Sequence, residues 1–510
     1  MYIKLCSAVL DGLNIHHIEV EVDIQNGLPN FVIVGLPDMM VREARDRVMA
    51  AVKNSDFAFP VKKITINLAP AFIRKDGSGI DLPMALGILA STAQVQSEEI
   101  RSYFFFGELS LNGEVRPVRG LLPMLIQLLK NNVTRVVVPY ANRYEACLIK
   151  GLLVYPVKNL KQLVAFLNGE EKLLPFENDI AILPQKETFG ETDFSDVKGQ
   201  ETAKRAMEIS AAGYHNIILV GSPGSGKTML AKRLPTIMPE MNFDEVLETT
   251  QLYSVCGLLS ENKYLISERV FRSPHSSISD AGLIGGSSNP KPGEVSLAHN
   301  GILFLDELPE FKRSTLELLR QPLGEREVTI SRAACSATYP ANFLLVAACN
   351  PCPCGYYFDS FRHCSCSPLQ IKHYMGKLSG PLLDRIDLQL EVNRLSPEEL
   401  VSAPQGDSSI QIKEKVWRAW GIQRSRFQGR KIRYNSGMQR REIEKYCRID
   451  AESGKLLSSC VETMGLSARA YDKILKISRT IADLADSDRI QLEHVAEAVQ
   501  YRIFDRKVWF

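Results

Sequence analysis

The chain has 510 residues, enough for roughly three domains that each bury a core of their own. Its 61 Lys and Arg residues balance 59 Asp and Glu residues, so a nucleic-acid surface would have to be local. No apolar segment is long enough to span a bilayer, and the N-terminus lacks the pattern of a signal peptide. We therefore expect a cytoplasmic protein without membrane association, in which the eleven cysteines are reduced thiols or metal ligands.

The first 168 residues alternate strand-like and helix-like segments. Strand-like runs occur at residues 31–34, 64–68 and 136–138, and helix-like runs occur at residues 41–52, 82–90 and 121–129. Strands that alternate with helices predict a layered α/β fold. We therefore place a first domain at residues 1–168 and a polar, proline-containing linker at residues 169–192.

A glycine-rich segment follows the apolar run at residues 217–220. Its residues are Gly221, Ser222, Pro223, Gly224, Ser225, Gly226, Lys227 and Thr228, which match the pattern GxxxxGK[ST]. In such a loop backbone N–H groups surround phosphates, the lysine reaches the β- and γ-phosphates, and the threonine hydroxyl binds Mg²⁺. The segment therefore predicts that the chain binds a nucleoside triphosphate together with Mg²⁺.

A second apolar strand, at residues 302–305, ends in Asp306 and Glu307. In nucleoside triphosphatases of this kind the first acid supports Mg²⁺ and the second polarises the attacking water. Taken alone, either segment is compatible with a glycine turn or an unrelated acidic strand end. Their occurrence together favours nucleotide hydrolysis.

A third apolar strand, at residues 343–348, ends in Cys349 and Asn350. A lone asparagine in this place more often caps a strand end. Beside the acidic strand, however, a polar side chain can orient the attacking water against the γ-phosphate, the role called sensor 1. Given the two preceding motifs, we predict the sensor role for Asn350.

Four cysteines gather in the segment that follows this strand. They are Cys352, Cys354, Cys364 and Cys366, spaced as C-x-C, nine residues and C-x-C. Four thiolates so close in sequence can hold a tetrahedral zinc ion, although C-x-C is tighter than the usual spacing. Cys349, His363 and His373 are possible substitute ligands. We expect a structural rather than a catalytic zinc site.

Two arginines further along are candidates for contact with the γ-phosphate. Arg385 precedes an apolar strand start, where it could form a surface salt bridge or, in an oligomer, project into the neighbouring chain's site. Arg469 opens a predicted helix and is a candidate sensor 2, which would fold onto the γ-phosphate of its own chain. We favour the catalytic role for both.

The C-terminal part of the chain, residues 393–510, has a helical pattern. Within it, residues 411–441 contain ten Lys and Arg residues and one acid, together with Trp417 and Trp420. A basic stretch with aromatic residues can follow a nucleic-acid backbone. A solvated helical face with two core tryptophans is an equally compatible interpretation.

Several longer segments resemble a known family. Residues 193–200 resemble the adenine-side box of AAA+ ATPases, and residues 271–275, 292–301 and 466–471 resemble the YifB/ComM family of magnesium-chelatase-like AAA+ proteins. The resemblance covers essentially the whole chain.

The resemblance implies a specific organisation and function. It implies an AAA+ ATPase domain at residues 193–392, an α-helical lid at residues 393–510, ATP and Mg²⁺ as cofactors, and a homo-hexameric ring. Members of the ComM type are implicated as DNA helicases that drive branch migration during recombination in natural transformation. Single-stranded or branched DNA, bound without sequence preference, is therefore the expected partner.

The same resemblance predicts two insertions that line the channel of the ring. The first spans residues 254–298, which are too long for a simple connection. The second is a hairpin at residues 324–332 that precedes the sensor strand. The candidate DNA-phosphate contacts on these elements are Lys291, Arg326 and Arg332, and solvated loop charge is the alternative for each.

Residues 75–83 and 107–120 resemble the proteolytic domain of Lon, which uses a serine activated by a lysine. The position of the Lon serine falls near Gly77, with Ser78 one residue away. The lysine of the Lon pattern is expected just after Gly120, where this chain has Leu121. We therefore expect an α+β, Lon-protease-like first domain that is catalytically inactive and serves ring assembly or DNA contact.

Four functions were compatible with these motifs. A DNA-dependent ATPase motor is the leading hypothesis, and a magnesium-chelatase-like remodelling ATPase with a protein or small-molecule client is the alternative. An ATP-dependent protease is disfavoured by the missing lysine. A non-enzymatic ATP switch is disfavoured by Glu307 and Arg385. Stimulation of ATP hydrolysis by DNA distinguishes the first function from the others.

Overall fold

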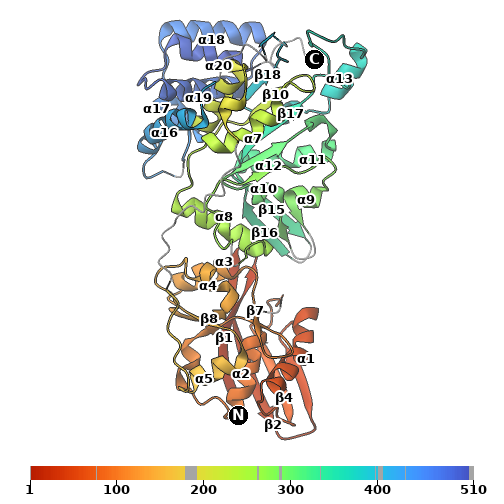
Figure 1. The fold of residues 1–510 in the computed structure, drawn as a ribbon, viewed down its shortest axis with the longest axis vertical. Coiled ribbons are helices and arrows are strands. Elements are labelled where there is room, and N and C mark those ends of the chain that lie inside the picture. The colour runs from red at the N-terminus through yellow and green to blue at the C-terminus, as the bar shows by residue number, and fades with distance from the viewer. Residues whose placement is uncertain are drawn as a thin grey trace. The chain divides into compact units, whose positions relative to one another are not determined.

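The computed structural model (Figure 1) describes residues 2–75, 77, 79–177, 192–260, 263–286, 290–332, 335–396, 398–399, 406–430, 432–502 and 504. The chain divides into two compact units. Unit 1 comprises Met1–Leu183 with Phe243–Ile266 and Ser331–Tyr339, and unit 2 comprises Pro184–Asn242, Ser267–Ile330 and Pro340–Phe510. Within the predicted domain 193–392, the segments Phe243–Ile266 and Ser331–Tyr339 are thus grouped with the N-terminal domain.

Unit 1 is built on a seven-stranded mixed sheet with the order β3-β4-β2-β1-β5-β8-β9. The strands are β1 (Tyr2–Asp11), β2 (Asn14–Gln25), β3 (Asn30–Val34), β4 (Lys63–Ala69), β5 (Phe104–Phe105), β8 (Arg135–Pro139) and β9 (Leu153–Val157), and β6 (Glu108–Leu109) pairs with β7 (Val115–Arg116) in a separate hairpin. Along β4, side chains alternate strictly between the core and the more accessible face. This alternation is typical of a sheet with one face on the core.

The helices of unit 1 cover this core. They are α1 (Met39–Asn54), α2 (Asp81–Ser91), α3 (Leu121–Lys130), α4 (Arg143–Ala146), α5 (Leu160–Leu167) and α8 (Phe243–Cys256), with short 3-10 turns η1 (Glu98–Ser102) and η2 (Tyr140–Asn142). All residues of α2 are buried. Helix α8 packs against α3, where the Gly120 N–H donates to the Ser254 carbonyl at 2.9 Å. The six strands and helices predicted for this domain lie within two residues of their expected bounds.

Unit 2 is built on a five-stranded parallel sheet with the order β11-β14-β17-β10-β18. The strands are β10 (Ile217–Val220), β11 (Phe271–Arg272), β14 (Ile302–Leu305), β17 (Leu344–Cys349) and β18 (Leu388–Glu391). All residues of β10, β14 and β17 are buried, as expected of a parallel sheet with both faces covered. The prediction of an α/β fold is confirmed.

Helices and two short hairpins complete the remaining part of the chain. The helices are α6 (Glu201–Gly213), α7 (Lys227–Ile237), α9 (Asp280–Ile284), α10 (Glu294–Leu297), α11 (Arg313–Leu318), α12 (Arg320–Glu325), α13 (Pro368–Met375), α14 (Gly380–Leu383), α16 (Ser409–Arg426), α17 (Arg440–Tyr446), α18 (Ala451–Met464), α19 (Ala468–Leu484) and α20 (Leu492–Gln500), with turns η3 (Phe194–Asp196), η4 (Leu308–Glu310) and η5 (Asn435–Gly437). The hairpins are β12 (Gly285–Gly286) with β13 (Lys291–Pro292), and β15 (Glu327–Arg332) with β16 (Cys335–Pro340).

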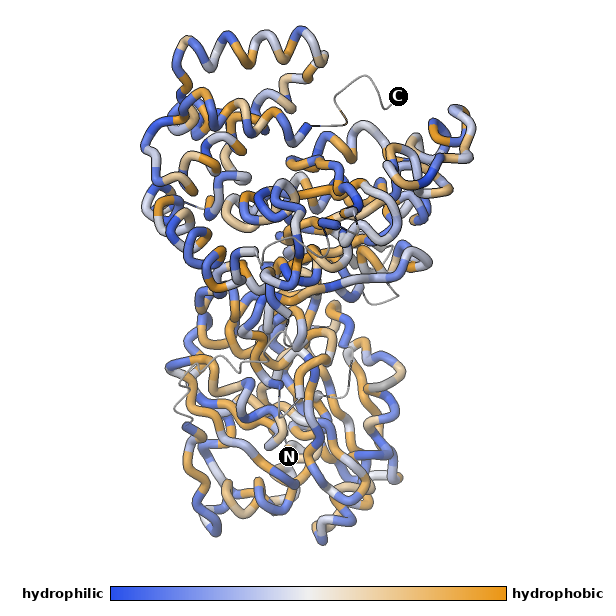
Figure 2. The backbone as a smooth tube through the Cα atoms, turned by 45° about the horizontal axis from the view of Figure 1, so that its top comes forward, coloured by the Kyte–Doolittle hydropathy of each residue, from blue (hydrophilic) through white to orange (hydrophobic). Residues whose placement is uncertain are grey.

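The C-terminal helices share a core with the sheet of unit 2. One buried cluster contains Leu219 and Val346 of the sheet together with Val416 of α16 and Ile474 of α19. Hydrophobic and hydrophilic residues alternate along these helices (Figure 2), which is the pattern of helices with one buried face. In the described part of the chain, no helix is both long and apolar enough to cross a membrane.

Candidate nucleotide-binding site

The glycine-rich loop connects the end of β10 to the start of α7. Gly224 and Gly226 have φ angles of 79° and 86°, a backbone region that L side chains rarely adopt. A Cβ atom on Gly221 would lie 2.2 Å from the Val392 carbonyl oxygen. The loop therefore requires these glycines, and it directs the N-terminal N–H groups of α7 toward a place where phosphates can bind.

Lys227 is the first residue of α7, and its side chain folds back over the loop. Its ammonium donates to the Gly221 and Ser222 carbonyls at 2.6 and 2.9 Å and lies 3.4 Å from Oδ1 of Asn350. Burial lowers the pKa of Lys227, while Cys349, Asp306 and Glu307 oppose this shift. The structure thus brings the predicted phosphate ligand and the predicted sensor residue together.

The predicted magnesium ligands are in direct contact. The Thr228 hydroxyl donates to Oδ2 of Asp306 at 2.8 Å. A hydroxyl and a carboxylate oxygen are hard ligands of the kind that Mg²⁺ selects, so this pair is suited to hold the ion beside the phosphates. The pairing of β14 with β17 and of β17 with β10 places both residues at the same sheet edge.

Glu307 lies next to this pair and has an unusual backbone conformation. Its φ and ψ angles are 52° and 47°, and its side chain is exposed. Left-handed geometry at a residue with a side chain costs about 1–2 kcal/mol, and such conformations cluster at functional sites. The Asp306 carboxylate accepts the Glu307 N–H at 2.9 Å and so stabilises this turn. The exposed Glu307 side chain thus lies next to the Thr228–Asp306 pair, and its role toward the attacking water stays a prediction.

Sequence reasoning missed Gln200 as part of the site. Gln200 also has a left-handed backbone, with φ 54°, and its side-chain amide donates to the Ser225 carbonyl of the loop. Its location at the end of the 193–200 segment was the only available signal. The contact links the predicted adenine-side box to the phosphate loop.

Arg385 lies at the opposite edge of the same sheet. In the parallel pair β10–β18, Ile217 is level with Leu388, so Arg385 precedes the strand start while the loop follows the strand end. A four-residue strand is about 13 Å long, which separates Arg385 from the loop of its own chain. The Arg385 guanidinium donates to the Arg320 and Pro381 carbonyls at 3.0 and 2.8 Å.

Arg469 lies in the first turn of α19, four residues before Lys473. Burial lowers the pKa of Arg385, and the positive charges of Arg320 and Arg469 add to this shift. Lys473, one turn further along α19, lies 2.8 Å from Asp387, which precedes β18 as Arg385 does. That Arg469 reaches the γ-phosphate of its own chain stays a prediction.

A buried ion pair fixes the region that carries these arginines. Asp387, at the start of β18, lies 2.8 Å from the Lys473 ammonium of α19 and accepts the Asn216 N–H at 3.1 Å. Burial alone would raise the pKa of Asp387, but the charges of Lys473 and His215 hold it well below its usual range. Arg326, Arg385, Lys473 and Lys476 line an adjacent cavity of about 450 Å³.

Replacement of Asp387 by Asn should destabilise unit 2. Removing one partner of a buried ion pair typically costs about 3–5 kcal/mol. Because the folded-state pKa of Asp387 is depressed, its contribution to stability is present above the unfolded pKa of about 3.9 and is lost as the pH falls below that value. Urea unfolding between pH 3 and pH 7, with Glu414→Gln as an exposed control, measures both effects. Equal stability of D387N and the parent at neutral pH would contradict the expectation.

The four cysteines converge as predicted from their spacing. Their sulfur atoms all lie within 4.8 Å of one another. Three of the Sγ–Sγ distances are 3.3 Å for Cys352–Cys354, 3.6 Å for Cys352–Cys364 and 3.5 Å for Cys354–Cys364. Tetrahedral zinc with bonds of about 2.3 Å sets sulfur–sulfur separations of about 3.8 Å, so the cluster fits zinc after a small expansion. Within the described residues, Cys349, His363 and His373 are not part of this group.

The predicted DNA contacts are dispersed. Lys291 is exposed on β13, and Arg326, half-buried at the end of α12, lines the 450 Å³ cavity described above. The side chain of Arg332 lies outside the described residues.

The basic stretch at residues 411–441 contains cations that pair with acids, and its two tryptophans differ in burial. Trp420 packs in the core and donates its Nε1–H to the Ala211 carbonyl at 3.1 Å, whereas Trp417 is 53% exposed. Five of the cations pair with acids: Lys413 with Glu240, Lys415 with Asp407, Arg426 with Asp483, Arg430 with Glu442, and Arg440 with Glu444. Half of the ten cations are thus paired with acids, Trp420 is a core residue, and Trp417 is exposed.

Comparison with known families agrees with this geometry. Family profiles match three segments: "Magnesium chelatase, subunit ChlI" at residues 193–400, "Subunit ChlI of Mg-chelatase" at residues 20–142, and "Magnesium chelatase, subunit ChlI C-terminal" at residues 406–502. The fold and site thus define a magnesium-chelatase-like ATPase, a class that implies ATP and Mg²⁺.

Individual similar proteins identify the family within this class of ATPases. The chain is similar to Competence protein ComM of Haemophilus influenzae, with 43% identity over 97% of this chain and 96% of that protein. It is also similar to the uncharacterized protein YifB of Escherichia coli, with 42% identity over 97% and 96% of the two chains. An uncharacterized Mycobacterium tuberculosis protein is 39% identical over 97% of each chain. The chain therefore belongs to the YifB/ComM family.

Two expectations about the N-terminal domain stay predictions. Ser78, which lies near the position of the Lon serine, is outside the described residues. Gly120 is followed by Leu121 and Leu122, which are buried at the start of α3. No lysine therefore occupies that helix start.

Proposed function

We propose that this chain is an ATP-hydrolysing motor that works as a homo-oligomeric ring, expected to be hexameric, on single-stranded or branched DNA. Its expected role is helicase-driven branch migration in recombination during natural transformation. The observation that carries the proposal is the division of the catalytic groups between the two edges of one parallel sheet. Lys227, Thr228 and Asp306 lie at one edge, and Arg385 lies at the other.

This division favours assembly of identical chains. A second copy that offers its phosphate loop to the edge bearing Arg385 would complete the site with an arginine at the γ-phosphate. Head-to-tail contacts of this kind close into rings when the rotation permits. We therefore assign Arg385 to the nucleotide of the neighbouring chain.

The DNA part of the proposal rests on the relatives and on one exposed surface. A relative with 43% identity is named a competence protein. On α16, Trp417 is exposed beside Arg418, and an aromatic ring next to a cation suits base stacking on single strands. Phosphate contacts make such binding strongly dependent on salt.

Steady-state ATP hydrolysis with and without single-stranded and forked DNA tests this function. Several-fold stimulation by DNA that disappears in Lys227→Ala and Glu307→Gln is expected. Trp417→Ala should reduce the stimulation while leaving basal hydrolysis unchanged. Ile410→Ala, which removes an exposed side chain without an aromatic ring from the same helix, is the control. Hydrolysis indifferent to every DNA would contradict the proposal.

That negative result would favour the alternative function, a chelatase-like remodelling ATPase with a protein or small-molecule client. The observation in its favour is that the three family profiles carry the name of a magnesium-chelatase subunit. The nucleotide site described above is the same for both functions.

We also propose that Cys352, Cys354, Cys364 and Cys366 hold a structural zinc ion. Protein purified without chelator should contain about one zinc ion per chain, as expected of a four-cysteine site. Cys364→Ser should lose the metal, and Cys460→Ser, on α18, should retain it. Metal analysis with thiol titration measures this. A content below about 0.3 zinc per chain with all thiols reduced would exclude the site.

A further inference from the structure

The cysteine cluster lies on a loop that is packed directly against the phosphate-binding loop. The loop leaves β17 after Asn350 and reaches Cys352 two residues later, where the Cys352 side chain is fully buried. Asn350 itself lies 3.4 Å from the Lys227 ammonium. The cluster is therefore anchored at the end of the strand that carries the predicted sensor residue.

Gly355 lies directly against Pro223 of the phosphate loop. Its φ angle is 86°, and a Cβ atom at this position would lie 2.7 Å from Cδ and 2.8 Å from Cγ of Pro223. Pro223 belongs to the phosphate loop, and its ring is rigid, so it could not move aside without shifting the loop backbone. The backbone of the cysteine loop and the ring of Pro223 are therefore too closely packed to admit a side chain at position 355.

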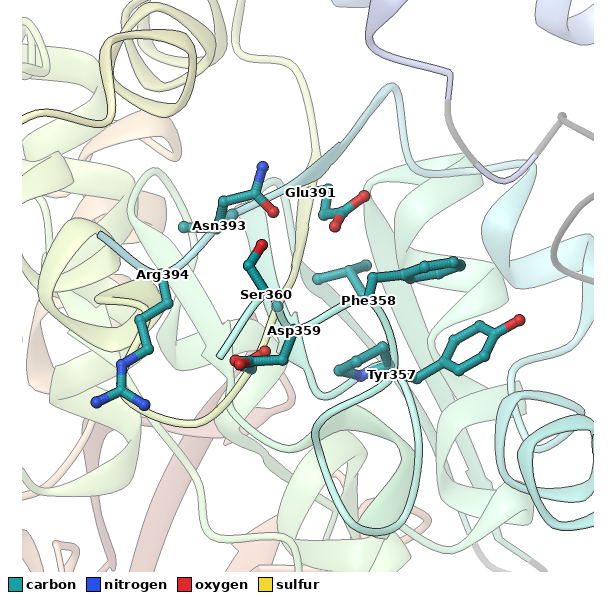
Figure 3. Close-up of a pocket in the computed structure, with 12 residues that line it drawn as sticks. Tyr357, Phe358, Asp359, Ser360, Glu391, Asn393 and Arg394 are labelled. Atoms are coloured by element: carbon teal, nitrogen blue, oxygen red, sulfur yellow. The ribbon is translucent and has the colours of Figure 1, made fainter. Parts of the chain in front are cut away.

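Asp359 lines a small cavity together with Ser222 of the phosphate loop (Figure 3). Its Oδ1 accepts the N–H groups of Phe361 and Arg362 at 2.8 and 2.9 Å, which fixes the carboxylate within its own loop. The Ser222 hydroxyl of the phosphate loop contributes most to the lowered pKa of Asp359, and Arg394 adds to it. Asp359, Ser222 and Arg394 line one small cavity.

The four cysteines lie on both sides of Gly355 and Asp359 in the sequence. Cys352 and Cys354 precede Gly355, and Cys364 and Cys366 follow Asp359. A single ion bound to all four sulfur atoms would close the intervening segment into a short ring and remove most of its conformational freedom. Without the ion, the segment would be held by weak thiol contacts and by a few hydrogen bonds, such as the one from Arg362 to the Tyr356 hydroxyl at 2.8 Å.

We propose that the metal-bound cysteine loop, residues 352–366, is a clamp that holds the phosphate loop in its nucleotide-binding shape. Zinc occupancy then sets the affinity for nucleotide, although zinc touches neither nucleotide nor Mg²⁺. The inference rests on the proposed zinc site and is independent of the DNA-motor function. Gly355 and Asp359 act as positioning residues.

Equilibrium nucleotide binding in the full-length protein tests the clamp. The probe is a fluorescent ADP analogue, measured with Mg²⁺ and without DNA, for zinc-loaded protein, protein stripped of zinc by a chelator that is then removed, and stripped protein after zinc is restored. We expect about tenfold weaker binding after stripping, similar to the loss seen when supporting residues around metal sites are removed. Restored zinc should restore the affinity.

Single substitutions that leave the zinc site intact distinguish loss of the loop contact from a general loss of folding. Gly355→Ala and Asp359→Asn should keep their zinc and still bind nucleotide more weakly. Gly429→Ala is the matched control for backbone strain, because Gly429 has φ 75° but nothing within 4 Å of its Cβ position. Binding by G429A should equal that of the parent.

Two results would overturn the clamp. One is unchanged nucleotide affinity in zinc-stripped protein, and the other is parent-like affinity in a zinc-loaded Gly355→Ala variant. Failure of the zinc site itself appears separately as absence of metal in the parent protein. Failure of the DNA-motor function appears only in the hydrolysis assays with DNA, so the three proposals fail in distinguishable ways.

Discussion

Glu307→Gln should reduce the turnover of ATP by about 10²–10⁴-fold, the range for removal of a general base, with nucleotide binding preserved. The amide has nearly the same shape as the carboxylate but cannot accept a proton from the attacking water. The Thr228–Asp306 contact and the Lys227 contacts do not involve the Glu307 side chain. Parallel measurements of steady-state hydrolysis and of nucleotide affinity give the comparison.

Two control variants show whether the loss of turnover is specific to Glu307 and separate from a loss of nucleotide binding. Glu310→Gln changes another exposed acid three residues further along and should leave turnover intact. Lys227→Ala should lose binding and turnover together, because the lysine contacts phosphates in both the ground and the transition state. If E307Q retained near-parent turnover, the base would have to be assigned to another residue.

Arg385→Ala should lower turnover by about 10³-fold or more, as for other arginines that act on a neighbour's phosphoryl group. Binding of nucleotide to the chain that carries the change should be little affected, since Arg385 lies at the sheet edge opposite to its own loop. Arg440→Ala is a suitable control, because its side chain is 90% exposed and pairs only with Glu444 within the described residues.

Mixing inactive chains tests whether Arg385 acts between copies. Lys227→Ala chains keep Arg385, and Arg385→Ala chains keep the phosphate loop. In a mixed ring, some interfaces combine the intact loop of one chain with the intact arginine of the other, so hydrolysis should partly return. Two inactive variants that stay inactive in every mixing ratio would contradict an arginine supplied by the neighbouring chain.

Much of the site could be predicted because its motifs are contiguous. The residues from Gly221 to Thr228 occupy one loop, and Asp306 and Glu307 follow one strand, so local sequence specified both. Their meeting at the Thr228–Asp306 contact followed from parallel strands that end at the same sheet edge. The cysteine group converged for a similar reason, since it lies within 15 residues, from 352 to 366.

Contacts between distant segments could not be predicted in this way. Gln200 reaches the Ser225 carbonyl, and Gly355 packs on Pro223, across separations that carry no periodic signal. The surroundings of Arg469 are not predictable from its local sequence for the same reason. A helix start can be recognised from its own residues, but the sheet edge against which it packs depends on the whole arrangement of α19 and β18.

The sequence by itself determined the family, the phosphate loop, the acids that follow β14 and the cysteine group, because each is encoded by residues close together in the chain. Only the tertiary structure decided that Arg385 lies away from its own phosphate loop, that α8 belongs to unit 1, and that Gly355 of the cysteine loop lies against Pro223. Those outcomes depend on strand order and on packing between residues far apart in sequence, which a local pattern does not contain.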